Sequence, residues 1–316
     1  MQEPPLEPWL FSRIALPKVW AGKALARLFA ADASDFPPGT GESIELADLK
    51  GCETTVRAGP ARGYTLRRLM NLHGREIIGG PWRDFPLAVK FLDTAEALSV
   101  QCHPADAPGK PGKSEAWIVL DARPGAVIYQ ALKPGLTRAD FEKALAAGMP
   151  EATLNARAVN AGDYLYNPAR MIHAIGPGLT LLEVQQSCDT TLRFFDWGRT
   201  GRELQLKEAL ATADFAAPPP PVVAAGSHEG LLELQKGPPF GVQSLRVKNA
   251  CRFAKEWPGF TLFTCLEGDC ELIVHGRGEI HTEHLRVADT LLVPAAFGEF
   301  EFFPRRPSWI IETYAV

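Results

Sequence analysis

The sequence lacks several features that would place it in a common class of protein. Lys and Arg number 33 against 37 Asp and Glu, so the net charge is −4 and the basic excess of a nucleic-acid binder is missing. Apolar stretches such as Leu291–Phe297 fall short of the roughly 18 residues that a membrane helix needs. The N-terminal segment MQEPPLEPWL is acidic and interrupted by proline, unlike a secretory signal. We therefore expect a cytoplasmic protein that has neither nucleic acid nor membrane as a partner.

The sequence also has too few cysteines to form a dense disulfide scaffold. Its six cysteines are scattered and none stands in the CxxC spacing of a zinc ribbon. Because no export signal is present, we expect all of these thiols to be reduced.

Turn-forming residues, in contrast, are abundant, with 28 Gly and 27 Pro. They separate short segments rich in apolar and β-branched residues, which predict many short strands and favour an antiparallel sandwich or jelly roll. Only a few helices are predicted. They cover Tyr64–His73 with Gly74 as C-cap, Thr137–Met149 with Thr137 as N-cap, and a segment from Thr200, with Glu203 completing a capping box, to about Thr212.

The clearest break in the chain is the segment AAPPPPVVAAG at 216–226. Four consecutive prolines cannot continue a helix or a strand ladder and favour an extended spacer. We therefore predict a larger domain at 1–215, a proline-rich linker at 216–226 and a small β-domain at 227–316.

A weak internal repeat spans this linker. GDYLYNPARMIH at Gly162–His173 aligns with ADTLLVPAAFGE at Ala288–Glu299, which pairs Pro168 with Pro294 and His173 with Glu299. The alignment predicts one β-unit used twice, with the histidine present only in the first copy.

A first group of candidate site residues begins in the segment LSVQCHP at Leu98–Pro104. Strand alternation places Ser99, Gln101 and His103 on one face and the intervening residues, including Cys102, on the other. Such a polar face is costly inside a β-domain unless it binds something. Together with Glu115 in GKSEAW and with His173, Gln101 and His103 form a nitrogen and oxygen set that zinc and other divalent first-row metals accept.

A second group follows His173. Glu183 lies on a strand after a glycine turn, and Arg193 lies on the next strand among Leu192, Phe194 and Phe195. An arginine in these surroundings either points into a pocket or extends outward to solvent.

These segments carry a resemblance to a known family. SVQCHP, GKSEAW, GDYLYNPARMIHAIGPG and LLEVQQSCDTTLRFFDWGR resemble the short bacterial form of type I mannose-6-phosphate isomerase, also called phosphomannose isomerase. Upstream, LPKVWAG, GESIEL and FPLAVKFLD resemble further elements of that family in the same order. The resemblance covers about residues 10–200, and the remaining chain fits the family's second β-domain.

The resemblance implies two cupin, or jelly-roll, domains, of which the first holds one Zn²⁺ ion and the second is a degenerate cupin without metal. By matching motif, the metal ligands are His103, Glu115 and His173, with Gln101 as a candidate fourth. Arg193 matches the active-site arginine, and Lys113 and Glu183 match residues of the substrate pocket.

The implied reaction interconverts mannose 6-phosphate and fructose 6-phosphate through a cis-enediol(ate). A metal ion can polarise the carbonyl, and Arg193 adds positive charge where negative charge develops. Glu183, Lys113 and a zinc-bound water are all candidates for the general base. Ser99 and Lys90 are candidates for substrate binding, with a solvent-facing position as the alternative for Lys90.

Two other functions fit the same residues. One is a metal-dependent cupin isomerase acting on a different sugar phosphate, since Ala21 replaces a glycine and GESIEL lacks a tryptophan of the family's motifs. The other is a sugar-binding regulatory cupin without turnover, although such a binder has no need of Lys113, Glu115, Glu183 and Arg193 together. For the oligomeric state we expect a monomer, with a homodimer as the alternative.

Overall fold

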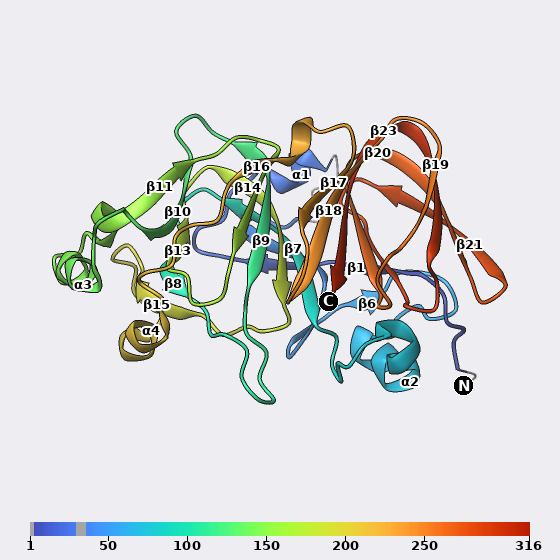
Figure 1. Ribbon diagram of the computed structural model, residues 1–316, viewed down its shortest axis with the longest axis horizontal. Helices are drawn as coiled ribbons and strands as arrows, with labels where there is room; N and C mark the ends of the chain where they lie inside the picture. The colour runs from blue at the N-terminus through green and yellow to red at the C-terminus, as the bar shows by residue number, and fades with distance from the viewer. Residues whose placement is uncertain (1–2, 30–35) are drawn as a thin grey trace. The chain divides into compact units, whose positions relative to one another are not determined.

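The computed structural model describes residues 3–29 and 36–316 (Figure 1). It is mainly β with a few short helices, which confirms the predicted fold class. The α-helices are α1 (Leu25–Leu28), α2 (Leu66–Ile78), α3 (Arg138–Ala146) and α4 (Leu206–Thr212), and short 3-10 turns cover Pro150–Thr153 and Ala225–Ser227. No helix in the described part of the chain is long and apolar enough to cross a membrane.

The strands form three large sheets and one small one. The first sheet has the order β17 (Gly230–Gln235), β18 (Phe240–Val247), β23 (Glu299–Ala315), β20 (Thr261–Gly276), β22 (Thr290–Val293), β1 (Trp9–Ser12) and β6 (Thr55–Val56), with β19 (Cys251–Ala254) also paired to β23 and β21 (Glu279–Arg286) to β20. The second has the order β11 (Leu154–Ala158), β10 (Val127–Leu132), β13 (His173–Ile175), β8 (Val100–Cys102) and β15 (Leu192–Phe195). The third has the order β16 (Val223–Ala224), β12 (Asp163–Asn167), β9 (Glu115–Ala122), β14 (Leu179–Gln186), β7 (Leu87–Thr94), β3 (Thr40–Leu46) and β2 (Ile14–Pro17). The small sheet pairs β4 (Asp48–Leu49) with β5 (Cys52–Glu53).

The described chain divides into two compact units. One unit comprises the described residues of Met1–Ile14, Ile44–Lys90 and Ala224–Val316, and the other those of Ala15–Ser43 and Phe91–Val223. One division point falls inside the proline-rich segment 216–226. The N-terminal residues group with the C-terminal part because β1 pairs with β22, on the far side of that segment. The units are therefore not contiguous in sequence, and the domain bounds 1–215 and 227–316 stay a prediction.

The unit that contains Phe91–Val223 is layered. Its main core lies between two sheets and joins Trp117 and Val119 of β9 with Ile128 of β10 and Ile175 of β13. A second core packs α3 and α4 on the other face of the five-stranded sheet, where Cys102 also lies. Cys102 is thus turned toward α4, as strand alternation predicts.

The helix boundaries correct two expectations. Gly74 does not end α2, although His73 beside it has non-helical backbone angles, φ of −125° and ψ of 19°, and kinks the helix there. Beyond this kink the helix continues to Ile78 and is capped by Gly79 in the left-handed conformation, with φ of 65°. The third predicted helix begins at Leu206 rather than near Thr200, so Glu203 completes no capping box. In that preceding segment Arg202 instead forms an ion pair with Asp196. The Thr137 cap of α3 is confirmed, with a capping box completed by Asp140.

Candidate metal centre and active site

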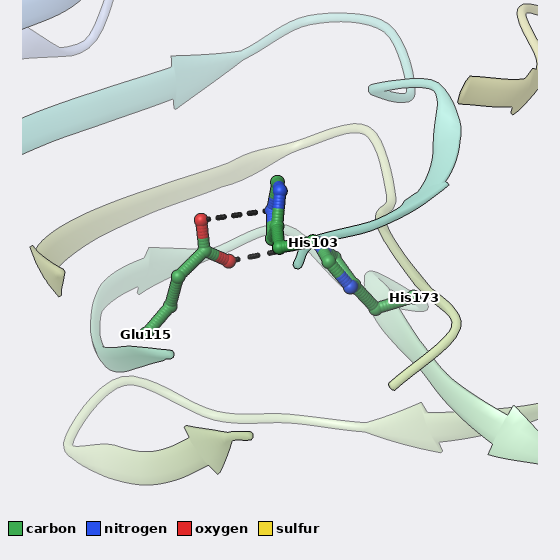
Figure 2. Close-up of side chains that lie close together, drawn as sticks. All are labelled: His103, Glu115 and His173. Carbon is green, nitrogen blue, oxygen red and sulfur yellow. Dashed lines mark ion pairs between the residues drawn. The ribbon is translucent and has the colours of Figure 1, made fainter. Parts of the chain in front are cut away.

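Three buried side chains from different strands meet in the unit that contains Phe91–Val223. His103 follows β8, Glu115 begins β9 and His173 begins β13, and their nearest ligand atoms all lie within 4.8 Å of one another. The carboxylate of Glu115 faces both histidines from one side, with a dashed line from each of its oxygens (Figure 2). Its Oε1 is 3.1 Å from His103 Nε2, and its Oε2 is 3.5 Å from His173 Nε2. The three residues are therefore arranged as a preformed ligand set.

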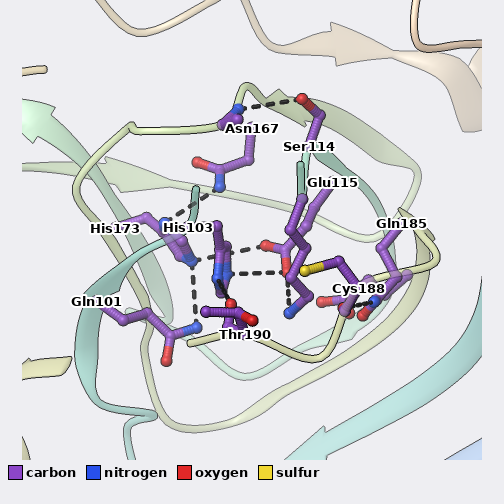
Figure 3. A network of polar contacts seen from close by, with 12 residues as sticks. Gln101, His103, Ser114, Glu115, Asn167, His173, Gln185, Cys188 and Thr190 are labelled. Atoms are coloured by element: carbon purple, nitrogen blue, oxygen red, sulfur yellow. Dashed lines mark hydrogen bonds and ion pairs between the residues drawn. The ribbon is translucent and has the colours of Figure 1, made fainter. Parts of the chain in front are cut away.

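Each histidine is oriented by a hydrogen bond to its other ring nitrogen. His103 Nδ1 lies 2.9 Å from the carbonyl oxygen of Thr190 (Figure 3). His173 Nδ1 lies 3.0 Å from the carbonyl oxygen of Met171. A protonated Nδ1 that donates to a carbonyl leaves the Nε2 lone pair available, which is how outer partners orient metal-binding histidines. Both Nε2 atoms point toward Glu115.

Burial sets the protonation states that a metal site needs. Burial lowers the pKa of His103 to about 4, although Glu115 opposes this shift. Burial also lowers the pKa of His173. For Glu115, burial alone would raise the pKa, but His103 and Lys113 outweigh it and hold the pKa of the carboxyl well below its usual value. Neutral imidazoles and an ionised carboxylate are the forms that bind a divalent metal.

Two of these ligand atoms lack a hydrogen-bond partner within the described residues. They are His103 Nε2 and Glu115 Oε2, both buried. Leaving buried polar atoms without partners is costly, and a bound cation would satisfy both. Two histidines and one glutamate also form a ligand set that catalytic zinc sites use, with a position left open. The residues therefore fit a zinc ion.

Gln101 and Ser99 extend this polar face as strand alternation predicts. Ser99 Oγ donates to Gln101 Oε1 at 2.8 Å, and Gln101 Nε2 lies 3.2 Å from His173 Nε2. Because the serine hydroxyl can donate or accept, the opposite orientation of the Gln101 amide is also compatible and would direct its oxygen to the ligand set.

Strand register places Arg193 on the same face. Gln101 of β8 pairs with His173 of β13 on one side and with Arg193 of β15 on the other. Residues directly opposite one another in antiparallel strands project to the same face of a sheet. The Nε of Arg193 is buried and has no hydrogen-bond partner among the described residues, and burial lowers the pKa of the guanidinium. Arg193 therefore projects from the same sheet face as Gln101 and His173, with its Nε buried.

Lys113 and Glu183 lie at the seven-stranded sheet that also carries Glu115. Lys113 lies just before β9, and Glu183 lies on β14. The ammonium of Lys113 contacts Glu115 Oε1 at 2.7 Å and is almost fully buried. Glu183 pairs in register with Trp117, and its Oε2 accepts a hydrogen bond of 2.8 Å from the indole nitrogen of Trp117. Lys90 lies half-buried on β7, and its assignment to substrate binding stays a prediction.

Sequence reasoning did not find the residues that support the ligands. Asn167 lies 3.1 Å from His173 Nδ1 and is held by Gln130, while Thr190 supplies the carbonyl for His103. Asn167 could have been found, because alternation in the segment before Pro168 places it in register with Glu115. Thr190 offers no such signal, because it acts through its backbone and lies 87 positions from His103.

Comparison with known proteins gives a consistent result. No family model matches the chain. It is 30% identical over 312 residues to the mannose-6-phosphate isomerase ManA of Bacillus subtilis, which covers 93% of this chain and 95% of that relative. It is also 30% identical over 300 residues to the mannose-6-phosphate isomerase of Streptococcus mutans, with 90% and 92% of the two chains covered.

Solved structures agree in fold. The crystal structure of the mannose 6-phosphate isomerase from Bacillus subtilis matches with a TM-score of 0.83 at 24% identity and covers 98% of this chain and 99% of that one. A variant of phosphomannose isomerase from Salmonella typhimurium matches with a TM-score of 0.74 at 14% identity, with the same coverage. Both likenesses extend over nearly the whole chain, so the two-cupin expectation for the fold is confirmed.

Proposed function

The chain belongs to the mannose-6-phosphate isomerase family, and from that premise we propose that it interconverts mannose 6-phosphate and fructose 6-phosphate with one zinc ion per chain. The observation that carries this proposal is the buried set of His103, Glu115 and His173 with Arg193 on the same sheet face. His103, Glu115 and His173 would hold the ion, with Gln101 as a fourth candidate.

The reaction moves a proton between C1 and C2 of the sugar and passes through a cis-enediol(ate). A bound zinc ion supplies Lewis acidity toward the carbonyl and hydroxyl oxygens of these two carbons. Arg193 adds a fixed positive charge on the same face, which stabilises the negative charge that develops on the sugar oxygens. Its partly desolvated guanidinium interacts more strongly than it would in water.

Glu183 and Lys113 are the two side chains that we propose for the proton transfer. Trp117 fixes one oxygen of Glu183, so the carboxylate has a defined direction. Lys113 is held on Glu115, which places its ammonium at the edge of the ligand set. A general base must come within hydrogen-bond reach of the transferred proton, so Glu183→Gln and Lys113→Met separate the two roles by their effect on turnover.

Substrate binding needs positive charge for the phosphate. The chain as a whole has a net charge of −4, so local cations must offset it. Ser99 and Lys90 stay candidates for substrate contacts. The monomeric state and the cytoplasmic location also stay predictions from the sequence.

The test is a coupled assay of mannose 6-phosphate conversion, with metal analysis of the same sample. We expect a chelator to abolish turnover and zinc to restore it. Arg193→Ala should reduce kcat by about 100-fold or more, the range for losing one donor to a developing oxyanion, while the bound zinc remains. Full activity of metal-free protein would overturn the zinc assignment. Turnover of another aldose phosphate, with none of mannose 6-phosphate, would overturn the substrate assignment.

A further inference from the structure

The β-unit that carries the ligand set has a counterpart in the unit that contains Ala224–Val316. In the first copy the N–H of Gly162 donates to the carbonyl of Val119, and in the second the N–H of Ala288 donates to that of Cys265. Both donors have positive φ, 94° for Gly162 and 68° for Ala288. Strands β12, β9 and β14 are adjacent in one sheet, and β22, β20 and β23 are adjacent in the other. The two copies therefore superpose strand by strand in register.

This register assigns an equivalent to each residue of the site. Glu183 pairs with Trp117, which pairs with Leu165, and in the second copy Glu312 pairs with Phe263, which pairs with Leu291. Glu312 is therefore the counterpart of Glu183. By the same register Thr261 replaces Glu115, so the second copy does not reproduce the metal ligands.

Glu312 differs from Glu183 in its surroundings. Its side chain is fully buried, and neither carboxylate oxygen has a hydrogen-bond partner among the described residues. Phe263, at the position of Trp117, offers no N–H donor. The nearby ammonium of Lys255 is engaged by the carbonyls of Gly259 and Ala295. A buried carboxyl without partners is costly to the fold, and the second copy carries this cost where the first provides Trp117.

A cavity of about 570 Å³ lies in the same unit. Gln243, directly across the sheet from Glu312, and Tyr314, two residues further along the same strand, both line it. Glu312 shares their sheet face but is fully buried and is not one of the residues that line the cavity. The volume is in the range of small-molecule sites.

The aromatic rings of this cavity are held in fixed positions. Trp257 stacks on Tyr314 with ring centroids 3.6 Å apart, and its indole nitrogen lies 3.2 Å from the carbonyl oxygen of Phe260. Tyr314 lies so close to Gly241 that a Cβ there would be 2.2 Å from its ring. Trp82, the third aromatic of the lining, lies similarly close to Gly80, where a Cβ would be 2.0 Å from its ring. The absence of side chains at both glycines lets these rings lie flat against the backbone.

From this geometry we propose that the second cupin binds an uncharged, hydroxyl-rich ligand, a saccharide without phosphate. The apolar C–H face of such a ring packs on Trp257, while Gln243 offers polar atoms to its hydroxyls. The charged side chains that line the cavity disfavour an anionic ligand. Glu233 and Lys236 form an ion pair of 3.4 Å, so the further carboxylate of Glu256 gives the lining a net negative charge. The site lies outside the metal centre and needs none of its residues.

The test is titration of the full-length protein with mannose, glucose, fructose, maltose and cellobiose, followed by saturation-transfer NMR and calorimetry. We expect at least one of them to bind with a dissociation constant of about 1 mM. Trp257→Ala should weaken binding by about tenfold, whereas Trp257→Phe, which keeps an aromatic ring, should stay within about threefold of wild type. Gln243→Ala should weaken binding several-fold.

Two controls separate this site from the metal centre and from loss of fold. Leu231→Ala changes an exposed side chain of β17 and should bind as wild type does. Glu115→Gln disables the metal centre and should keep sugar binding at this second site. Absence of binding by all five sugars at about 50 mM, well above millimolar affinity, would overturn the proposal. Binding that survives Trp257→Ala or disappears with Glu115→Gln would also overturn it. So would binding of choline, a cation that packs on aromatic rings, in place of any of the sugars.

Discussion

At the scale of single residues, the buried carboxyl of Glu312 should make stability depend on pH. Burial raises the pKa of Glu312 to about 8, against 4.5 for an unburied glutamate, and Lys255 only partly opposes the shift. The folded protein therefore binds this proton more tightly than the unfolded chain. Its stabilising contribution is fully present below about pH 4.5 and is lost as the pH rises toward 8.

Glu312→Gln should remove this dependence. We expect the unfolding free energy of wild type to fall from pH 5 to pH 8 relative to the variant, by an amount on the order of a few kcal/mol. Urea unfolding of both proteins at several pH values measures the difference. Parallel pH profiles for the two proteins would show that Glu312 titrates as an exposed carboxyl does.

At the scale of elements, the end of α2 offers a matched pair of glycines. Gly79 has a φ of 65°, and a Cβ there would lie 2.4 Å from the Cβ of Ala295 and 2.5 Å from the carbonyl oxygen of Pro258. Gly74 lies within α2 directly after the kink at His73, its φ is not positive, and its added Cβ would meet only Met70 Cε at 3.6 Å. The same substitution should therefore have opposite effects at the two positions.

We expect Gly79→Ala to destabilise the protein by about 2 kcal/mol, through strain at positive φ and the close contacts. Gly74→Ala should instead stabilise it by roughly 0.5–1 kcal/mol, the difference in helix propensity between the two residues. Chemical denaturation compares both with wild type. Equal effects at the two sites would contradict the conformations described for α2.

The same helix shows why element boundaries are hard to predict from sequence. A glycine after an apolar helical pattern is a common C-cap, and Gly74 fits that pattern as well as Gly79 does. The last carbonyls of α2 accept hydrogen bonds from the N–H groups of Phe260, Ala295 and Ala296, so the end of the helix also involves contacts far away in sequence. The Thr137 cap was predictable because its partner Asp140 is three residues away. Local signals therefore sufficed where the deciding contact is local.

At the scale of the whole molecule, the candidate site was more predictable than the chain's division into units. Strand alternation alone places Gln101 and His103 opposite Cys102, and the motifs that contain Glu115 and His173 complete the ligand set. The pairing of β1 with β22 has no counterpart in local sequence, because the two strands are almost the whole chain apart. The proline segment marks only one of the points at which the units divide.

The ligand set should link metal binding to the stability of the folded protein. Its three residues come from both sheets of one sandwich, and a metal that binds only the folded state stabilises it by about 2.7 kcal/mol at a free concentration about 100 times its dissociation constant. Zinc should therefore raise the melting temperature of wild type by several degrees and leave that of Glu115→Gln unchanged. His228→Gln, at an exposed histidine outside the set, should respond as wild type does. Differential scanning calorimetry with and without zinc makes the comparison, and an equal zinc response in Glu115→Gln would place the binding site elsewhere.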